Sequence, residues 1–280
     1  MRICSIKVGG EAHLGIVGAR GVIDATAAGY PHSIDEVIAG ADRSALAALE
    51  RDDSAPIVAA PEYLNIVSRP GKLVCVGLNY RSHAANVALK TAEIPILFSK
   101  FSDSLAPSGA GISLPAWEES YDYEAELVIV IGKRAWNVAA ENAADYIFGY
   151  TCGNDLSCRG AQQRTSQWLI GKALPGFGPC GPYIATADSF DPTQGRQIRS
   201  WVNGELRQDG RTDDMIHSCA AIVSYASKYI ALEAGDLIFT GTPSGVELEK
   251  REGEQRWLRA GDTVEVEIEG IGRLVNHMVK

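Results

Sequence analysis

The 280-residue sequence predicts an α+β protein with a small N-terminal α+β domain. Short apolar stretches of strand length, separated by glycine turns, recur along the chain, whereas helical stretches are few. Strands do not alternate regularly with long helices, which argues against a doubly wound parallel sheet. The length corresponds to about two domains. We place the boundary between Ala60 and Pro70, which gives an N-terminal domain of residues 1–65 and a larger domain of residues 66–280.

Composition and charge exclude several classes of protein. The formal net charge of −9 provides no basic face for nucleic acid. No apolar run approaches the roughly 18–20 residues of a membrane span, and the first residues lack the apolar core of a secretory signal. The six scattered cysteines are expected to be reduced thiols. We therefore expect a cytoplasmic protein that binds neither nucleic acid nor membrane.

Local patterns predict the elements of the N-terminal domain. Alternating apolar residues at 2–8 and 13–17, with Gly9 and Gly10 between them, predict a β-hairpin. Two short helices are expected at 33–39, where Ser33 can cap the first turn, and at 43–51.

The larger domain is rich in predicted strands. A helix is expected over 212–230, capped by Thr212 and carrying an apolar stripe at helical spacing. Val264, Val266 and Ile268 alternate with glutamates, which predicts a strand with one solvated face. The other predicted strands cover residues 73–76, 123–131, 147–151, 181–185 and 237–240.

Two glutamates in the predicted strand 123–131 are the most informative pair. Residues two apart in a strand point to the same face, so Glu124 and Glu126 stand side by side, with Val128 and Val130 further along. Two carboxylates beside apolar surface are costly unless a cation neutralises them. A divalent metal ion is one solution and a solvated strand end is the other, and this pair alone does not decide between them.

Asp155 provides a third candidate oxygen ligand. It follows the predicted strand 147–151 and, if a helix begins there, Arg159 and Gln162 lie on its face. The simpler alternative is an aspartate that only caps the helix. Three carboxylates together favour Mg²⁺, Mn²⁺ or Ca²⁺ over zinc.

Three other residues are candidates for catalysis or anion binding. His83 lies in a polar, helix-compatible stretch, where it would act as a general base on a mobile lid; an exposed surface histidine is the common alternative. Lys172 would bind a substrate carboxylate or oxyanion, although most lysines are solvated. Thr242 lies in a tight turn at 241–245 that would contact an anion or serve only as a turn.

Taken together, these segments resemble the fumarylacetoacetate hydrolase family over about residues 70–280. The resemblance rests on CVGLNY at 75–80 with His83, YEAEL at 123–127, ND at 154–155, QW at 167–168 and GTPSGV at 241–246. It implies a mixed β-sandwich roll, a homodimer, and Mg²⁺ or Mn²⁺ bound by Glu124, Glu126 and Asp155. It also implies that His83 and Lys172 are catalytic and that a small-molecule substrate is bound by Tyr80, Arg81, Arg159, Gln162 and Thr242.

Members of this family cleave, decarboxylate, dehydrate or isomerise small 2-oxo acids and β-diketo acids. The resemblance implies a hydrolase that cleaves a C–C bond of an acylpyruvate-type acid. The 1-carboxylate and 2-oxo group would chelate the metal, and His83 would deprotonate the attacking water. The alternatives are a decarboxylase or keto–enol isomerase at the same site, and a protein that binds metal and oxo acid without catalysis.

Two positions depart from the family pattern. Relatives often carry a glutamate three residues after the lid histidine, where this chain has Asn86. An amide cannot stabilise imidazolium as a carboxylate does, and such a loss can cost up to about 10⁴-fold in rate. Glu93 is a candidate replacement. The second departure is Pro175, where relatives often have aspartate. The Asn86 departure favours decarboxylation or isomerisation, which need no activated water.

Overall fold

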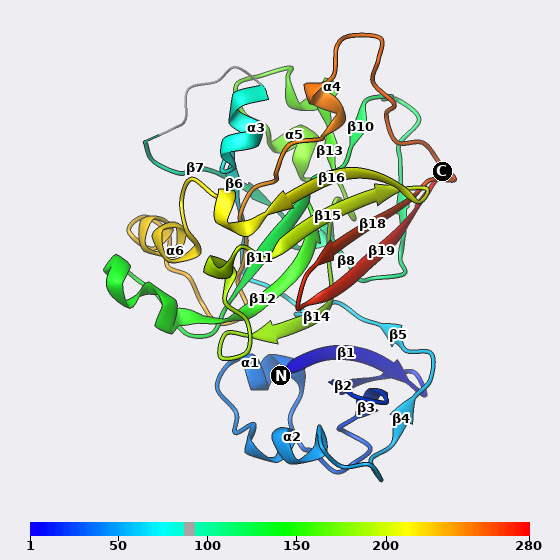
Figure 1. Ribbon diagram of the computed structural model, residues 1–280, viewed down its shortest axis with the longest axis vertical. Coiled ribbons are helices and arrows are strands. Elements are labelled where there is room, and N and C mark those ends of the chain that lie inside the picture. Colours follow the sequence, from blue (N-terminus) through cyan, green and yellow to red (C-terminus); the bar gives the residue numbers. More distant parts are fainter. Residues whose placement is uncertain (87–92) are drawn as a thin grey trace.

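The computed structural model describes residues 1–86 and 93–280 and shows an α+β protein dominated by β-sheet, which confirms the predicted fold class (Figure 1). The helices are α1 (Ile34–Ile38), α2 (Ser44–Leu49), α3 (Arg81–Asn86), α4 (Arg159–Gln162), α5 (Leu169–Lys172) and α6 (Cys219–Ser227). The strands are β1 (Arg2–Val8), β2 (Glu11–Gly18), β3 (Gly21–Asp24), β4 (Ile57–Val58), β5 (Glu62–Tyr63), β6 (Leu73–Gly77), β7 (Ile96–Lys100), β8 (Leu105–Ala106), β9 (Gly111–Ser113), β10 (Tyr121–Asp122), β11 (Ala125–Ile131), β12 (Ile147–Asn154), β13 (Ser157–Cys158), β14 (Gly178–Thr186), β15 (Gln197–Val202), β16 (Glu205–Arg211), β17 (Leu237–Phe239), β18 (Thr263–Ile268) and β19 (Gly272–Val279).

Two large sheets organise the molecule. The strands of the first follow the order β4-β3-β2-β1-β14-β12-β11-β17-β6-β7, and those of the second the order β16-β15-β18-β19-β9. Pairing of β1 with β14, for example Ile3 with Ile184, joins the N-terminal hairpin to the sheet of the larger domain. One sheet therefore crosses the boundary placed between residues 65 and 66, and the division into two domains stays a prediction.

Strand β11 lies in the middle of this arrangement and is buried along its whole length. Leu127, Ile129 and Ile131 belong to the core shared with α6 and the second sheet. Val128 and Val130 belong to the core that includes the N-terminal strands. A strand that is buried on both faces carries a nearly continuous apolar run, which explains the sequence of this segment.

Four strand termini meet at one edge of the first sheet. Ala125 at the start of β11 pairs with Asn154 at the end of β12. Strand β17 runs antiparallel to β11 and parallel to β6, so that its end and the end of β6 reach the same edge. Helices α3, α4 and α5 gather at this edge, at the end of the molecule opposite the N-terminal strands (Figure 1).

Most predicted elements are confirmed, including the hairpin and both N-terminal helices. In α1, Ser33 and Glu36 form a reciprocal capping box. The predicted helix 212–230 is wrong in its first part: only Cys219–Ser227 is α-helical, and Ser218 caps it. The hydroxyl of Thr212 cannot cap a helix there, because it accepts from the Arg196 amide and contacts the Pro192 carbonyl.

All six cysteines are buried free thiols, as expected. Within residues 1–86 and 93–280, no helix has the length and apolar character needed to cross a membrane. The expected homodimer and the cytoplasmic location stay predictions.

Candidate metal and substrate site

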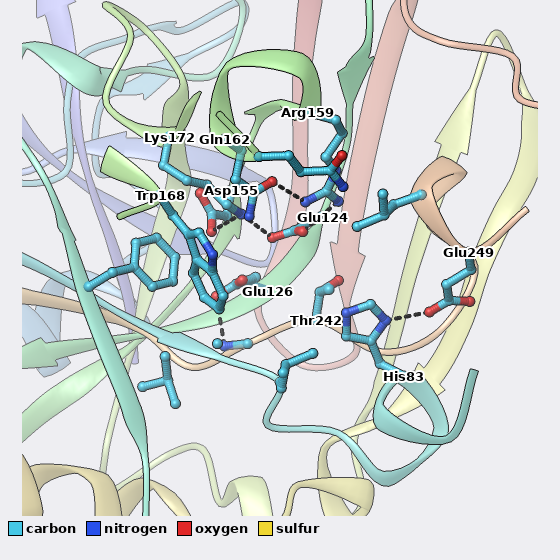
Figure 2. Close-up of a pocket in the computed structure, with 17 residues that line it drawn as sticks. His83, Glu124, Glu126, Asp155, Arg159, Gln162, Trp168, Lys172, Thr242 and Glu249 are labelled. Carbon is cyan, nitrogen blue, oxygen red and sulfur yellow. Dashed lines mark hydrogen bonds and ion pairs between the residues drawn. The ribbon is translucent and has the colours of Figure 1, made fainter. Parts of the chain in front are cut away.

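A cavity of about 410 Å³ opens at the edge where the four strand termini meet (Figure 2). It contains most of the polar residues that the sequence singled out. Its lining consists of Val76, Gly77, Leu78, His83, Phe98, Glu124, Glu126, Asp155, Arg159, Gln162, Gln163, Trp168, Lys172, Gly241, Thr242, Leu248 and Glu249.

Glu124, Glu126 and Asp155, here called the carboxylate cluster, form one buried wall of this cavity. Each contributes a carboxylate oxygen, and these oxygens all lie within 4.8 Å of one another. Two local expectations are corrected. Glu124 precedes β11 because its amide donates to the Asn154 side chain at 2.9 Å, outside the strand ladder. The helix begins at Arg159 instead of Asp155, because the intervening residues form β13.

Two buried cations that line the cavity contact the cluster. Lys172 Nζ lies 2.6 Å from Glu124 Oε2 and 2.7 Å from Asp155 Oδ2. Arg159 Nη2 lies 2.6 Å from Glu124 Oε1. Burial alone would raise the pKa of Glu124, but Lys172 and Arg159 outweigh it and hold that pKa well below its usual range.

Glu126 has a different environment. Its Oε2 accepts a hydrogen bond from the Gly241 amide at 2.8 Å. Burial, followed by the charges of Asp155 and Glu124, raises the pKa of Glu126 well above its usual range. Two adjacent glutamates are thus driven in opposite directions by their neighbours.

The chemistry of the cluster fits a hard divalent cation, because all its donors are carboxylate oxygens. Among the described residues, four buried acids at this site face three buried cations; the acids are Asp122, Glu124, Glu126 and Asp155, and the cations are Lys100, Arg159 and Lys172. With all four acids ionised, one negative charge has no counterion. A divalent ion would supply the missing positive charge.

Lys100 is not among the residues that line the cavity, but it forms a buried ion pair with Asp155. No sequence pattern indicated this role. Its side chain is fully buried, and its Nζ lies 2.6 Å from Asp155 Oδ1. The same ammonium donates to the carbonyls of Leu156 at 3.1 Å, Phe177 at 2.9 Å and Lys172. The apolar residues 96–98 and Ser99 precede Lys100 in the sequence, and no local pattern sets this lysine apart.

His83 and Glu249, here called the histidine pair, lie on another side of the cavity (Figure 2). His83 Nδ1 is bonded to Glu249 Oε1, and both side chains are buried. Glu249 ends a short 3₁₀ turn, Glu247–Glu249, and its Oε2 accepts from the Gly245 amide at 2.9 Å. The carboxylate missing at position 86 is therefore supplied from a distant segment. Glu93, the replacement suggested by the sequence, is exposed, and the rest of the expected lid, residues 87–92, lies outside the described residues.

Asp122 connects the carboxylate cluster to the segment that carries Glu249. Its Oδ2 accepts from Arg159 Nε at 2.9 Å and from the Leu248 amide at 3.0 Å. Its Oδ1 accepts from the Glu247 amide at 2.9 Å. One buried carboxylate therefore positions both Arg159 and the turn that ends at Glu249.

The remaining residues assigned to substrate binding differ in their position. Gln162 lines the cavity, and its side-chain oxygen accepts from Arg159 Nη1 at 3.0 Å. The Thr242 hydroxyl donates to the Ala125 carbonyl at 2.9 Å and accepts from Gln208 Nε2 at 2.8 Å. Its only proton is therefore committed to the backbone next to Glu126.

Tyr80 and Arg81 are not among the residues that line the cavity. Tyr80 is fully buried in the core beside Met215, with which it forms an isolated β-bridge. Arg81 is exposed, and its guanidinium donates to the Asp213 carbonyl at 3.4 Å. Both precede or begin the helix that carries His83, so the structure places them beside the site and not in it.

Comparisons with known proteins agree with this geometry. Residues 72–279 match the family model of the fumarylacetoacetate (FAA) hydrolase C-terminal domain. Mitochondrial oxaloacetate tautomerase fahd2 of Xenopus laevis is 36% identical over 215 residues, which cover 76% of this chain and 67% of that protein. The structure of a fumarylacetoacetate hydrolase from psychrophilic Exiguobacterium antarcticum is 35% identical, with a TM-score of 0.87 over 100% of this chain and 99% of that one. Maleylpyruvate hydrolase from Sphingobium sp. SYK-6, in complex with manganese(II) and pyruvate, is 28% identical, with a TM-score of 0.82 over 100% of this chain and 99% of that one.

Proposed function

Because the chain belongs to the fumarylacetoacetate hydrolase family, we propose that it is a divalent-metal-dependent hydrolase that cleaves a C–C bond in a small acylpyruvate-type acid. The observation that carries this proposal is the histidine pair, which lines the same cavity as the carboxylate cluster. Hydrolysis needs a base that activates water, and a histidine bonded to a carboxylate is such a base.

Glu124, Glu126 and Asp155 would hold Mg²⁺ or Mn²⁺, with Ca²⁺ as a further candidate. When bound, such an ion supplies Lewis acidity that polarises the 2-oxo group and stabilises negative charge on it. The likeness to a hydrolase solved with manganese(II) and pyruvate supports this assignment.

Lys172 is suited to bind anionic oxygen and not to act as a base. Burial alone would lower the pKa of Lys172, but Asp155 and Glu124 outweigh it and raise that pKa above its usual value. Lys172 therefore stays an ammonium at neutral pH and donates hydrogen bonds. Together with Arg159 it would stabilise the enolate that forms when the neighbouring C–C bond breaks.

His83 is suited to take a proton from water. Since Nδ1 is bonded to Glu249, we assign the ring proton to Nδ1, which leaves Nε2 as the base. Figure 2 shows the ring turned toward Thr242 and the cavity. The carboxylate of Glu249 would also stabilise the imidazolium that follows proton transfer.

Keto–enol isomerisation of a 2-oxo diacid is the second candidate, and the 36% identity to an oxaloacetate tautomerase favours it. In that reaction His83 would move a proton at carbon 3, and no water would attack. The same residues serve both reactions, so the products must distinguish them.

The proposal is tested by turnover in ¹⁸O-labelled water with Mg²⁺. Hydrolysis of an acylpyruvate is expected to place one solvent oxygen in the newly formed carboxylate, and the Glu124→Ala variant is expected to be inactive. Conversion of enol oxaloacetate to its keto form, without cleavage of any acylpyruvate, would replace hydrolysis by isomerisation. Undiminished turnover by Glu124→Ala would refute the metal assignment.

A further inference from the structure

Uncharged groups make up much of the described lining of the cavity outside the carboxylate cluster. Its apolar lining consists of Val76, Gly77, Leu78, Phe98, Trp168 and Leu248. Among the described lining residues, the basic side chains are Arg159 and Lys172, which contact the cluster, and His83, which is bonded to Glu249.

Trp168 supplies the broadest apolar surface of this wall, and two neighbours hold its ring. A Cβ built on Gly77 would lie 2.5 Å from Cζ3 and 2.9 Å from Cη2 of Trp168, so the indole rests directly on the Gly77 backbone. Phe98 packs against the indole edge-to-face, with ring centroids 5.4 Å apart. Glycine at position 77 thus makes room for the ring, and strand β7 supports it.

The charges that line the cavity disfavour a distal carboxylate on the substrate relative to an uncharged distal group. A second substrate carboxylate in this cavity would face the carboxylate of Glu249 and the carboxylate cluster. Among the described lining residues, the permanent cations are Arg159 and Lys172, and both already contact acidic side chains. Transfer of a carboxylate from water into the cavity costs much free energy when no cation pairs with it. Transfer of an uncharged group that packs on the face of an indole ring is favourable.

We propose that the substrate is a monocarboxylate: a 2,4-dioxo acid whose distal group is uncharged and packs on Trp168. This inference rests on the proposed function and narrows its substrate class. The cavity of about 410 Å³ is of a size typical for ligand sites and leaves room for such a group beyond the keto-acid part.

The test compares two acids that differ at one end only. 2,4-Dioxoheptanoate ends in a methyl group, and 2,4-dioxoheptanedioate has a carboxylate in its place. With Mg²⁺-loaded full-length protein, kcat/KM is expected to be at least about tenfold higher for the monocarboxylate, the scale on which a single misfitting group discriminates. Equal values, or a higher value for the dicarboxylate, would overturn the inference and leave hydrolysis standing.

A charge added to the lining sharpens this test. Gln163 lines the cavity, is exposed and follows the last residue of α4 as its C-cap, so its replacement is compatible with the fold. Gln163→Lys is expected to raise kcat/KM for the dicarboxylate and so to narrow the preference. Gln163→Met, the matched uncharged control, is expected to leave the ratio of the two values as it is. An unchanged ratio in Gln163→Lys would count against the electrostatic argument.

The aromatic wall is tested by replacing its main ring. Trp168→Ala is expected to lower kcat/KM for 2,4-dioxoheptanoate mainly by raising KM, and Trp168→Phe is expected to recover part of the loss. A loss confined to kcat, with KM unchanged, would contradict packing of the distal group on the indole.

Failure of the proposed function has a separate signature. If neither acid is turned over, hydrolysis is refuted, and calorimetric binding of both acids to the Mg²⁺-loaded protein then decides the present inference. Tighter binding of the monocarboxylate supports it, and equal or tighter binding of the dicarboxylate overturns it.

Discussion

The carboxylate cluster and the histidine pair share one cavity but are built by different parts of the fold. The cluster sits where sheet register brings strand termini together, and buried ion pairs to Lys100, Arg159 and Lys172 hold it. The histidine pair joins a short helix to a 3₁₀ turn 166 residues further along the chain. Loops and short turns tolerate change better than paired strands. The carboxylate cluster depends on strand register, whereas the histidine pair depends on a contact between two short segments far apart in the chain.

The supports of His83 illustrate the second kind of construction. The amide and hydroxyl of Ser82 both donate to Asp214 Oδ2, at 3.0 and 2.6 Å. The Asn79 side chain donates to the carbonyls of His217 and Thr240 at 3.0 and 2.8 Å. Contacts with residues 214–217 and with Thr240, and not pairing within the two large sheets, therefore position the helix that carries His83.

Metal removal is expected to have the largest effect on activity. Chelation with EDTA should abolish turnover, and Mg²⁺ or Mn²⁺ should restore it, because the ion neutralises the excess charge of the cluster. Because the folded cluster binds the ion, the metal should also raise the midpoint of thermal unfolding. Full activity of protein shown by elemental analysis to be free of metal would contradict the assignment.

Glu249→Gln is expected to lower kcat by up to about 10⁴-fold, because an amide does not stabilise the imidazolium of His83. Metal affinity, measured by calorimetric titration, should stay unchanged, since Glu249 does not belong to the cluster. Glu93→Gln is the matched control: this exposed residue should affect neither quantity. A comparable loss of kcat in Glu93→Gln would show that Glu93, and not Glu249, stabilises the imidazolium of His83.

Lys100→Met is expected to lower the free energy of unfolding by about 3–5 kcal/mol, because it removes the cation buried against Asp155. Lys7→Met provides the matched control. Lys7 pairs with Glu62 at the surface, where an ion pair contributes about 0–1 kcal/mol. Urea unfolding in EDTA measures both variants, and equal effects would show that burial of Lys100 has no energetic consequence.

The smallest effect concerns the pH dependence of stability in the metal-free protein. Folding raises the pKa of Glu126 above its ordinary value of 4.5, mainly through burial. The folded state therefore binds this proton more tightly than the unfolded state. The resulting stabilisation is complete below pH 4.5 and is lost as pH rises through the folded-state pKa. Glu126→Gln should flatten this decline in urea unfolding measured between acidic and alkaline pH, and a parallel decline in both proteins would contradict it.

Parts of the site depend on local pattern and could be predicted. The two-residue spacing of Glu124 and Glu126, together with Asp155 after the neighbouring strand, indicated a cluster that the structure brings together. Tyr80 was assigned to the site from its motif, yet the structure buries it in the core. Lys100 and Asp122 carry no local signal, because their role depends on which backbone and side-chain groups the fold packs against them.

By itself, the sequence determined the strand-rich fold class, the central buried strand, the capped first helix and the acidic residues of the carboxylate cluster. These features follow from side-chain periodicity and from hydrogen bonds between residues a few positions apart. Both are set by the local backbone geometry and do not depend on the rest of the fold. Only the tertiary structure decided that Glu249 pairs with His83, that Lys100 forms a buried ion pair with Asp155, and that residues 212–218 lie outside the helix. Those outcomes depend on contacts between segments far apart in the chain, and no local pattern encodes the partner of a buried side chain.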